Sequence, residues 1–281
     1  MSIHRILGLA ALLGLTVVAC SQAATFPEDA ITIRANNDIG VGAGRLLVGV
    51  SLFDGTRVGS PDDPVSLEVA AMDEPSRTQQ AAGTFTWMVP DVFGLYRADF
   101  DFDRPGVWQV TVIPEIGDPL EPAAFIVLEE TEAPNIGDQA PIVDTPTLGE
   151  FPIGELTTDP EPDPRFYQQS LDEALTNGRQ TVVVFSTPAF CQTSACGPLL
   201  NVVKDAAPAY PNVDFVHVEV YTGLREPGFA VDAAHLAPAV TQEYWNLPSE
   251  PWVFIVDGSG VIEARFEGVM DVTELEQYLS S

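Results

Sequence analysis

Two cysteines separated by four residues, Cys191 and Cys196, are the part of this sequence best suited to chemistry. They follow a β-branched and aromatic run, Thr181 to Phe185, and precede apolar residues at helical spacing that begin at Leu199. A thiolate is the reactive form of cysteine, and the amino end of a helix stabilises negative charge. We therefore predict that Cys191 is the attacking thiol of a redox pair and that Cys196 resolves the mixed disulfide.

A third cysteine, Cys20, follows an uncharged apolar run from Ile6 to Val18. The run is too short to span a bilayer comfortably, and the sequence around Ala19-Cys20 resembles a bacterial lipobox. This resemblance implies a signal peptide over residues 1–19, a palmitate-bearing lipid on Cys20 and a tether over residues 20–30. We expect a lipoprotein on the extracytoplasmic face of the cell membrane, where a disulfide between the other two cysteines can persist.

Composition narrows the possible partners. The chain has 281 residues, a formal net charge of −29 and 46% hydrophobic residues. Such a negative field repels nucleic acid, so DNA and RNA binding are set aside, and the predicted contact with the membrane is through the lipid anchor. The length is sufficient for two domains, each with its own core.

Seven short segments with strand character lie between residues 31 and 128, separated by Gly, Pro, Asp or Asn. They are residues 31–33, 45–53, 65–71, 84–89, 95–102, 107–113 and 124–128. They predict an all-β sandwich domain over residues 31–128. The segments Gly94–Phe100 and Gly106–Val112 resemble the last hairpin of immunoglobulin-like envelope modules. Residues 129–164 are rich in Pro and acids and are predicted to form a linker.

Residues 165–281 are expected to alternate helices and strands, with helices over 165–176 and 239–245 and a strand that begins directly after Pro251. Together with the cysteine pair, this order resembles the thioredoxin-fold superfamily, in its extracytoplasmic branch. The resemblance implies a C-terminal α/β thioredoxin-like fold in which Cys191, Cys196 and a cis-proline at Pro251 form the catalytic site. The expected architecture is thus an immunoglobulin-like sandwich followed by an α/β domain.

The motif departs from the family pattern in three ways. The cysteine spacing is CxxxxC rather than CxxC, Phe190 replaces the usual tryptophan, and residues 182–185 lack the usual acid. The predicted function is thiol-disulfide exchange with envelope protein thiols or disulfides, without a cofactor.

Three alternatives remain open from the sequence. The disulfide could be purely structural in a lipoprotein that binds a partner. The run from Thr187 to Gly197 also resembles peroxiredoxins of the bacterioferritin-comigratory type, which implies peroxidase activity with Thr187 near the peroxide. A copper site could use Cys191, Cys196 and His235, whereas His217 is expected to be an ordinary sheet residue.

Overall fold

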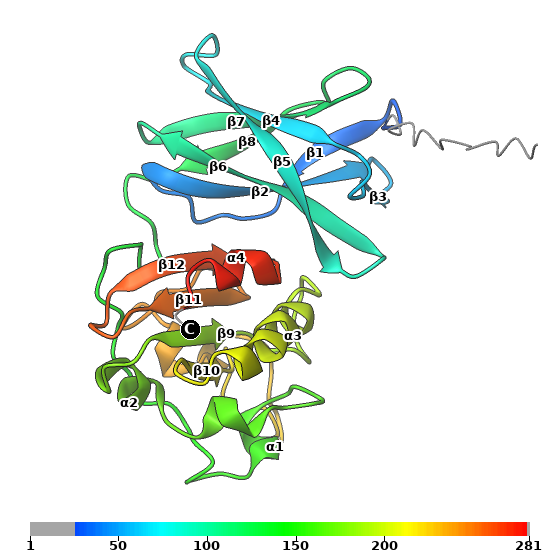
Figure 1. Ribbon diagram of the computed structural model, residues 1–281. Helices are drawn as coiled ribbons and strands as arrows, with labels where there is room; N and C mark the ends of the chain where they lie inside the picture. The colour runs from blue at the N-terminus through cyan, green and yellow to red at the C-terminus, as the bar shows by residue number, and fades with distance from the viewer. Residues whose placement is uncertain (1–25, 280–281) are drawn as a thin grey trace, which may run out of the picture.

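The computed structural model describes residues 26–279, which form two β-sheets stacked along one axis of the molecule (Figure 1). The chain is mostly β, with 15% helix. The predicted signal peptide and Cys20 lie outside the described residues. Within residues 26–279, no helix has the length and apolar character needed to cross a bilayer.

The first sheet has eight strands in the order β1-β2-β6-β5-β4-β7-β8, with β3 paired to β2. Alternating residues of these strands point inward around Trp108, Phe102 and Leu67, and the pattern of one buried residue in two is what made them recognisable in the sequence. The strands are β1 (Ala30–Arg34), β2 (Gly42–Leu52), β3 (Arg57–Val58), β4 (Val65–Ala71), β5 (Thr78–Val89), β6 (Phe93–Phe102), β7 (Gly106–Pro114) and β8 (Ala123–Val127).

Strand β5 explains why the predicted immunoglobulin-like sandwich is wrong. Its first half pairs with β4 and its second half pairs with β6, so one long strand joins what a sandwich would keep as two sheets. Gly83 lies at this change of partner, where a Cβ would come within 2.6 Å of Val65. The segment just before β8 also approaches β1, through a parallel bridge between Ile31 and Glu121. The result is a nearly closed, barrel-like sheet.

The second sheet has four strands in the order β10-β9-β11-β12. The β9–β10 pair is parallel, whereas β11 runs antiparallel to both β9 and β12. Strand β9 is buried on both faces, since Val182 and Val184 join one apolar cluster while Val183 and Phe185 join another. The strands are β9 (Thr181–Phe185), β10 (Asp214–Val218), β11 (Trp252–Val256) and β12 (Ile262–Glu267).

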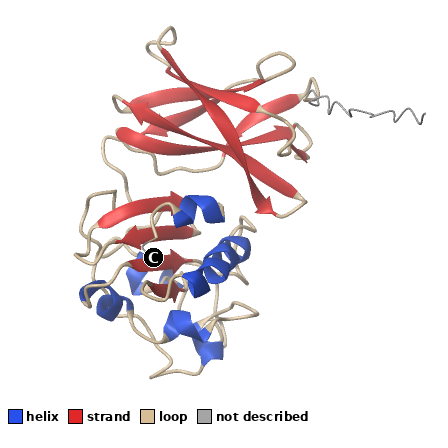
Figure 2. Cartoon of the chain, in the orientation of Figure 1, coloured by secondary structure: helices blue, strands red, loops and turns tan. Residues whose placement is uncertain are grey.

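The helices are short, and among the described residues they all follow residue 152 (Figure 2). Ser170 and Asp271 begin α2 and α4 with capping boxes. Only α3, with 11 residues, exceeds two turns. The α-helices are α1 (Ile153–Leu156), α2 (Leu171–Thr176), α3 (Cys196–Ala206) and α4 (Val272–Glu276), and the 3₁₀ turns are η1 (Pro164–Tyr167), η2 (Ala207–Ala209), η3 (Ala233–His235) and η4 (Pro238–Val240).

The prediction of a C-terminal α/β thioredoxin-like fold is therefore corrected: the second unit is a small sheet with short helices in a mostly β chain. The helix expected over residues 165–176 is divided, because Asp163 caps a single 3₁₀ turn and Ser170 then caps a separate helix of six residues. The helix expected over 239–245 is only the 3₁₀ turn η4, after which Asn246 adopts φ 44°. Start signals of 3₁₀ turns and α-helices are alike in sequence, so the expected helices were too long.

The two sheets are joined by apolar contacts and ion pairs. Leu47, Met88 and Leu95 of the first sheet pack against Ala195 and Val269 of the second unit. Residues 129–164, which run between the sheets, are also packed, and Ala133, Ala140 and Val143 belong to the core beside β9. The segment in front of α3 is therefore held against the barrel-like sheet.

Candidate functional site

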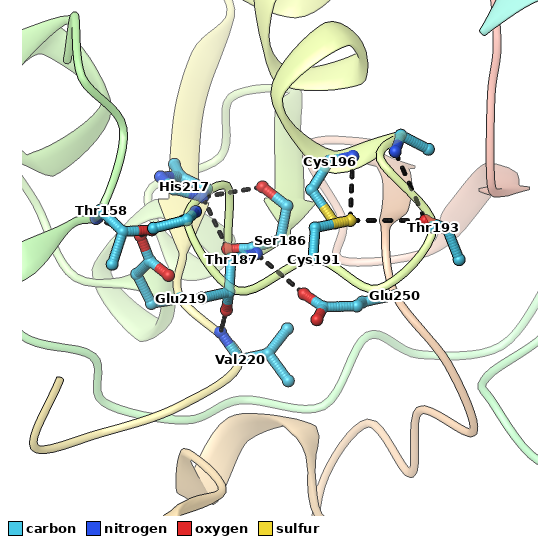
Figure 3. The surroundings of a disulfide bond; sticks show 12 residues. Thr158, Ser186, Thr187, Cys191, Thr193, Cys196, His217, Glu219, Val220 and Glu250 are labelled. Carbon is cyan, nitrogen blue, oxygen red and sulfur yellow. Dashed lines mark hydrogen bonds between the residues drawn. A yellow bond between two sulfur atoms is a disulfide. The ribbon is translucent and has the colours of Figure 1, made fainter. Parts of the chain in front are cut away.

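Cys191 and Cys196 form a disulfide, with their Cα atoms 5.9 Å apart, as the sequence predicted (Figure 3). Cys191 lies in the loop after β9, and Cys196 is the first residue of α3. Their exposure differs: Cys196 is fully buried and Cys191 is partly exposed. Of the two cysteines, only Cys191 therefore has surface that a second molecule can reach.

The sulfur of Cys191 also has polar neighbours. The backbone N–H of Cys196 lies 3.2 Å from it and donates a hydrogen bond, and the Thr193 hydroxyl lies at 3.3 Å. These donors come from the loop and the first turn of an 11-residue helix, whose free N–H groups favour negative charge. Ser194, at φ 63°, turns the loop into that helix. A thiolate released at Cys191 would be stabilised by these groups.

The bond between Glu250 and Pro251 is cis, which confirms the predicted isomer at Pro251. Glu250 itself was not singled out from the sequence. Its carboxylate accepts a hydrogen bond from the Thr187 N–H at 2.8 Å and points toward the cysteine loop (Figure 3). Burial, together with the charge of Glu219, raises the pKa of Glu250 to about 7. An acid that titrates near neutral pH thus contacts the loop that leads from β9 to Cys191, although β9 itself has none.

Behind the loop lies a buried polar network. His217, in β10 as expected, contacts the Tyr167 hydroxyl through Nδ1 at 2.6 Å and the Ser186 carbonyl through Nε2 at 3.0 Å. Burial lowers the pKa of His217, so the imidazole is neutral at pH 7. The proton then lies on Nε2, because the Ser186 carbonyl can only accept, and Nδ1 accepts from Tyr167.

Glu219, two residues further along, anchors the loop from the other side. Its Oε1 atom accepts bonds from the Thr157 hydroxyl at 2.9 Å and from both the N–H and the hydroxyl of Thr158. The Thr158 hydroxyl in turn accepts from the N–H of Ala189, two residues before Cys191. The segment 157–158 and β10 together position the cysteine loop.

Thr187 and His235, which the peroxidase and copper alternatives would use, make other contacts in the structure. Thr187 is buried, and its hydroxyl accepts a bond from the Val220 N–H rather than facing the cysteines. His235 contacts Asp232 and packs against Phe229, which in turn packs against Phe190. Among the described residues, no group of three His, Cys, Asp or Glu side chains is arranged to hold a metal ion.

Comparison with known proteins adds little. No protein-family model matches the chain, and no curated protein matches it. One solved structure that matches in part is a putative glycoside hydrolase from Bacteroides vulgatus ATCC 8482, at 13% identity and a TM-score of 0.22. The match covers 43% of this chain and 25% of that one. A likeness this weak carries no argument about fold or activity. What the fold and the site define is a mostly β protein in which one cysteine of a disulfide is partly exposed and the other is buried.

Proposed function

We propose that this protein carries out thiol-disulfide exchange, with Cys191 as the sulfur that partners attack and Cys196 as the resolving sulfur. The observation that supports it most is the asymmetry of the pair. Cys191 is reachable and has hydrogen-bond donors for a thiolate, whereas Cys196 is fully buried. A disulfide that only stabilised the fold would need neither property. A ring of six residues also contributes little through chain entropy, about 2 kcal/mol.

The reaction has two steps. A partner thiolate attacks Sγ of Cys191, which forms a mixed disulfide and breaks the Cys191–Cys196 bond. Cys196 leaves as a thiolate and takes up a proton. A second partner thiolate attacks the partner sulfur of the mixed disulfide, which releases Cys191 as a thiolate and the partner as a disulfide. Two partner thiols are thereby oxidised while the cysteine pair is reduced, and the reverse sequence reduces a partner disulfide.

Glu250 is the proposed proton carrier for this exchange. Its pKa of about 7 leaves it part acid and part carboxylate near neutral pH, which suits a group that gives a proton in one direction and takes it in the other. The Thr187 N–H fixes one of its oxygens.

The proposed partners are protein thiols or disulfides at the outer face of a membrane. This part of the proposal rests on the sequence before residue 21, where Cys20 would carry the lipid.

The test is to trap the mixed disulfide. Cys196→Ser leaves Cys191 as the free thiol and is expected to hold a disulfide-bonded adduct with an oxidised partner, such as insulin or glutathione disulfide. Cys191→Ser is the matched control and is expected to form the adduct far more slowly, because the remaining thiol is buried. Equal adduct formation by the two variants would contradict the assigned roles. A reduction potential below about −300 mV would instead indicate a structural disulfide.

A further inference from the structure

A cavity whose lining does not include the disulfide lies at the end of β10. It has a volume of about 690 Å³ and runs between the segment 144–156, Tyr167, the end of β10 and the loop 221–226. Its size is that of a small-molecule site, and part of its wall is apolar, with Phe151, Leu156 and Leu224.

One side chain of this cavity has unused hydrogen-bonding capacity. Glu219 is 7% exposed, and its Oε1 atom already accepts three hydrogen bonds, an arrangement that suits a carboxylate. Its Oε2 atom is buried and has no hydrogen-bond partner. A buried carboxylate oxygen without a donor is costly, so a ligand that supplies one gains more than it would at the surface.

Among the described residues, the carboxylate of Glu219 has no positively charged partner. In residues 26–279, no ion pair joins Glu219 to a basic side chain, and the nearby His217 is neutral. Arg225 is the one Lys or Arg among the described residues lining the cavity, and its Nε donates to the Gly154 carbonyl. Four further carboxyl groups line the same cavity: Asp144, Glu150, Glu155 and Glu226.

We propose that this cavity binds a small organic cation, an ammonium group on an apolar body, with the ammonium donating to Oε2 of Glu219. The apolar part lies along Phe151, Leu156 and Leu224. The acidic residues of the lining favour a positive over a neutral or negative ligand. This site is independent of the proposed disulfide chemistry, although Glu219 reaches the cysteine loop through Thr158 and Ala189.

The test is calorimetric titration of the full chain at low ionic strength with phenethylammonium chloride, compared with its neutral isostere 2-phenylethanol. We expect saturable binding of the cation, at least tenfold tighter than that of the alcohol. Glu219→Gln, which keeps an acceptor oxygen for the two threonines, is expected to weaken cation binding at least tenfold. Glu68→Gln on strand β4 is the matched control and is expected to leave binding unchanged.

A variant at the apolar wall keeps the proposal testable if Glu219→Gln does not fold. Leu224→Trp adds volume to a residue of the lining and is expected to abolish cation binding while the disulfide still reacts with dithiothreitol. The proposal is overturned if the cation does not bind saturably, if the alcohol binds equally well, or if folded Glu219→Gln or Leu224→Trp binds as the wild type does.

Discussion

Two pairs of carboxylates in this protein differ in whether an arginine neutralises them. Between the two sheets, Asp38 accepts from the N–H groups of Glu132 and Ala133 and from Arg265 at 2.6 Å. Glu274 is held there by Arg45 at 2.7 Å and by Arg97 at 3.2 Å. Near the cysteine loop, Glu219 and Glu250 have no ion pair among the described residues.

This difference distinguishes the carboxylates that stabilise the junction between the sheets from those assigned to the two proposed functions. Burying a carboxylate without a cation is expensive, and the arginines at the junction between the sheets remove that cost. The same chain leaves the cost in place at Glu250, which contacts the cysteine loop, and at Glu219, which lines the cavity at the end of β10. Carboxylates kept without a cation are available to a proton or to a ligand, which is the property that both proposals use.

The largest expected effect comes from removing the arginine that pairs with a buried carboxylate. Arg265→Ala removes the cation from Asp38, whose side chain is fully buried, and it also removes the donor to the Ala133 and Pro134 carbonyls. We expect the free energy of unfolding to fall by about 3–5 kcal/mol, because an unpaired charge remains buried. Denaturant unfolding measures it.

An exposed pair provides the control. Arg77 and Asp103 lie 2.7 Å apart, but their side chains are 64% and 36% exposed. Arg77→Ala is expected to change the stability by less than about 0.5 kcal/mol. A similar decrease in the free energy of unfolding for Arg265→Ala and Arg77→Ala would contradict the larger contribution expected of the buried ion pair.

The next effect tests the unpaired group through pH. In the native state the pKa of Glu250 is raised from 4.5 to about 7, so between these values the unfolded chain ionises first and stability falls as the pH rises. Glu250→Gln removes this loss. Allowing for partial solvent screening, we expect the variant to be more stable than wild type by about 1–2 kcal/mol at pH 8. The difference is expected to vanish below pH 4.5.

The same variant separates stability from proton transfer. The measurement is the rate constant for reduction of the disulfide by glutathione, expressed per glutathione thiolate. In the wild type this rate constant is expected to decrease above pH 7, because Glu250 then loses the proton that the leaving Cys196 thiolate takes up. Glu250→Gln is expected to be slower below pH 7 and to lack the inflection. An unchanged pH profile would remove Glu250 from the mechanism.

A smaller effect is expected from the link between Glu219 and the cysteine loop. Thr158→Val removes the hydroxyl that donates to Glu219 and accepts from the Ala189 N–H. We expect a loss of stability of about 1–2 kcal/mol and faster hydrogen exchange at Ala189. Thr176→Val, on an exposed hydroxyl that bonds only its own helix, is the control. Unchanged exchange at Ala189 would mean that the hydroxyl does not hold the loop.

Much of the strand content could be predicted from the sequence, because alternation of polar and apolar residues marks strands with one solvent-facing side. The first half of β5, Thr78–Gly83, was missed because its sequence TQQAAG has little β propensity and forms a strand through its pairing with β4. That omission concealed the barrel-like closure. Helix lengths failed for a different reason, since a cap marks where a helix starts and not how far it continues.

The candidate site, too, could be predicted from the sequence only in part. The cysteine pair and Pro251 were evident from residue type and position. Glu219 was not, because alternation in residues 213–220 places polar residues on a solvent face, whereas both faces of this sheet are covered. Glu250 lies outside that run, and its residue type alone does not mark it. Only the three-dimensional arrangement shows that Glu219 is buried and that Glu250 accepts from Thr187.

The bond between Arg45 and Glu274 joins residues 229 positions apart. During synthesis, the barrel-like sheet can be complete long before α4 exists, so Arg45 and Arg97 must stay solvated until nearly the whole chain has been made. Docking of the two sheets is therefore expected to be a late event in folding, because contacts so distant in sequence close slowly. Met88 and Leu95 pack against Ala195, the residue before Cys196, only at that stage. The order of synthesis thus leaves the end of the cysteine loop without the barrel-like sheet against it until α4 has been made.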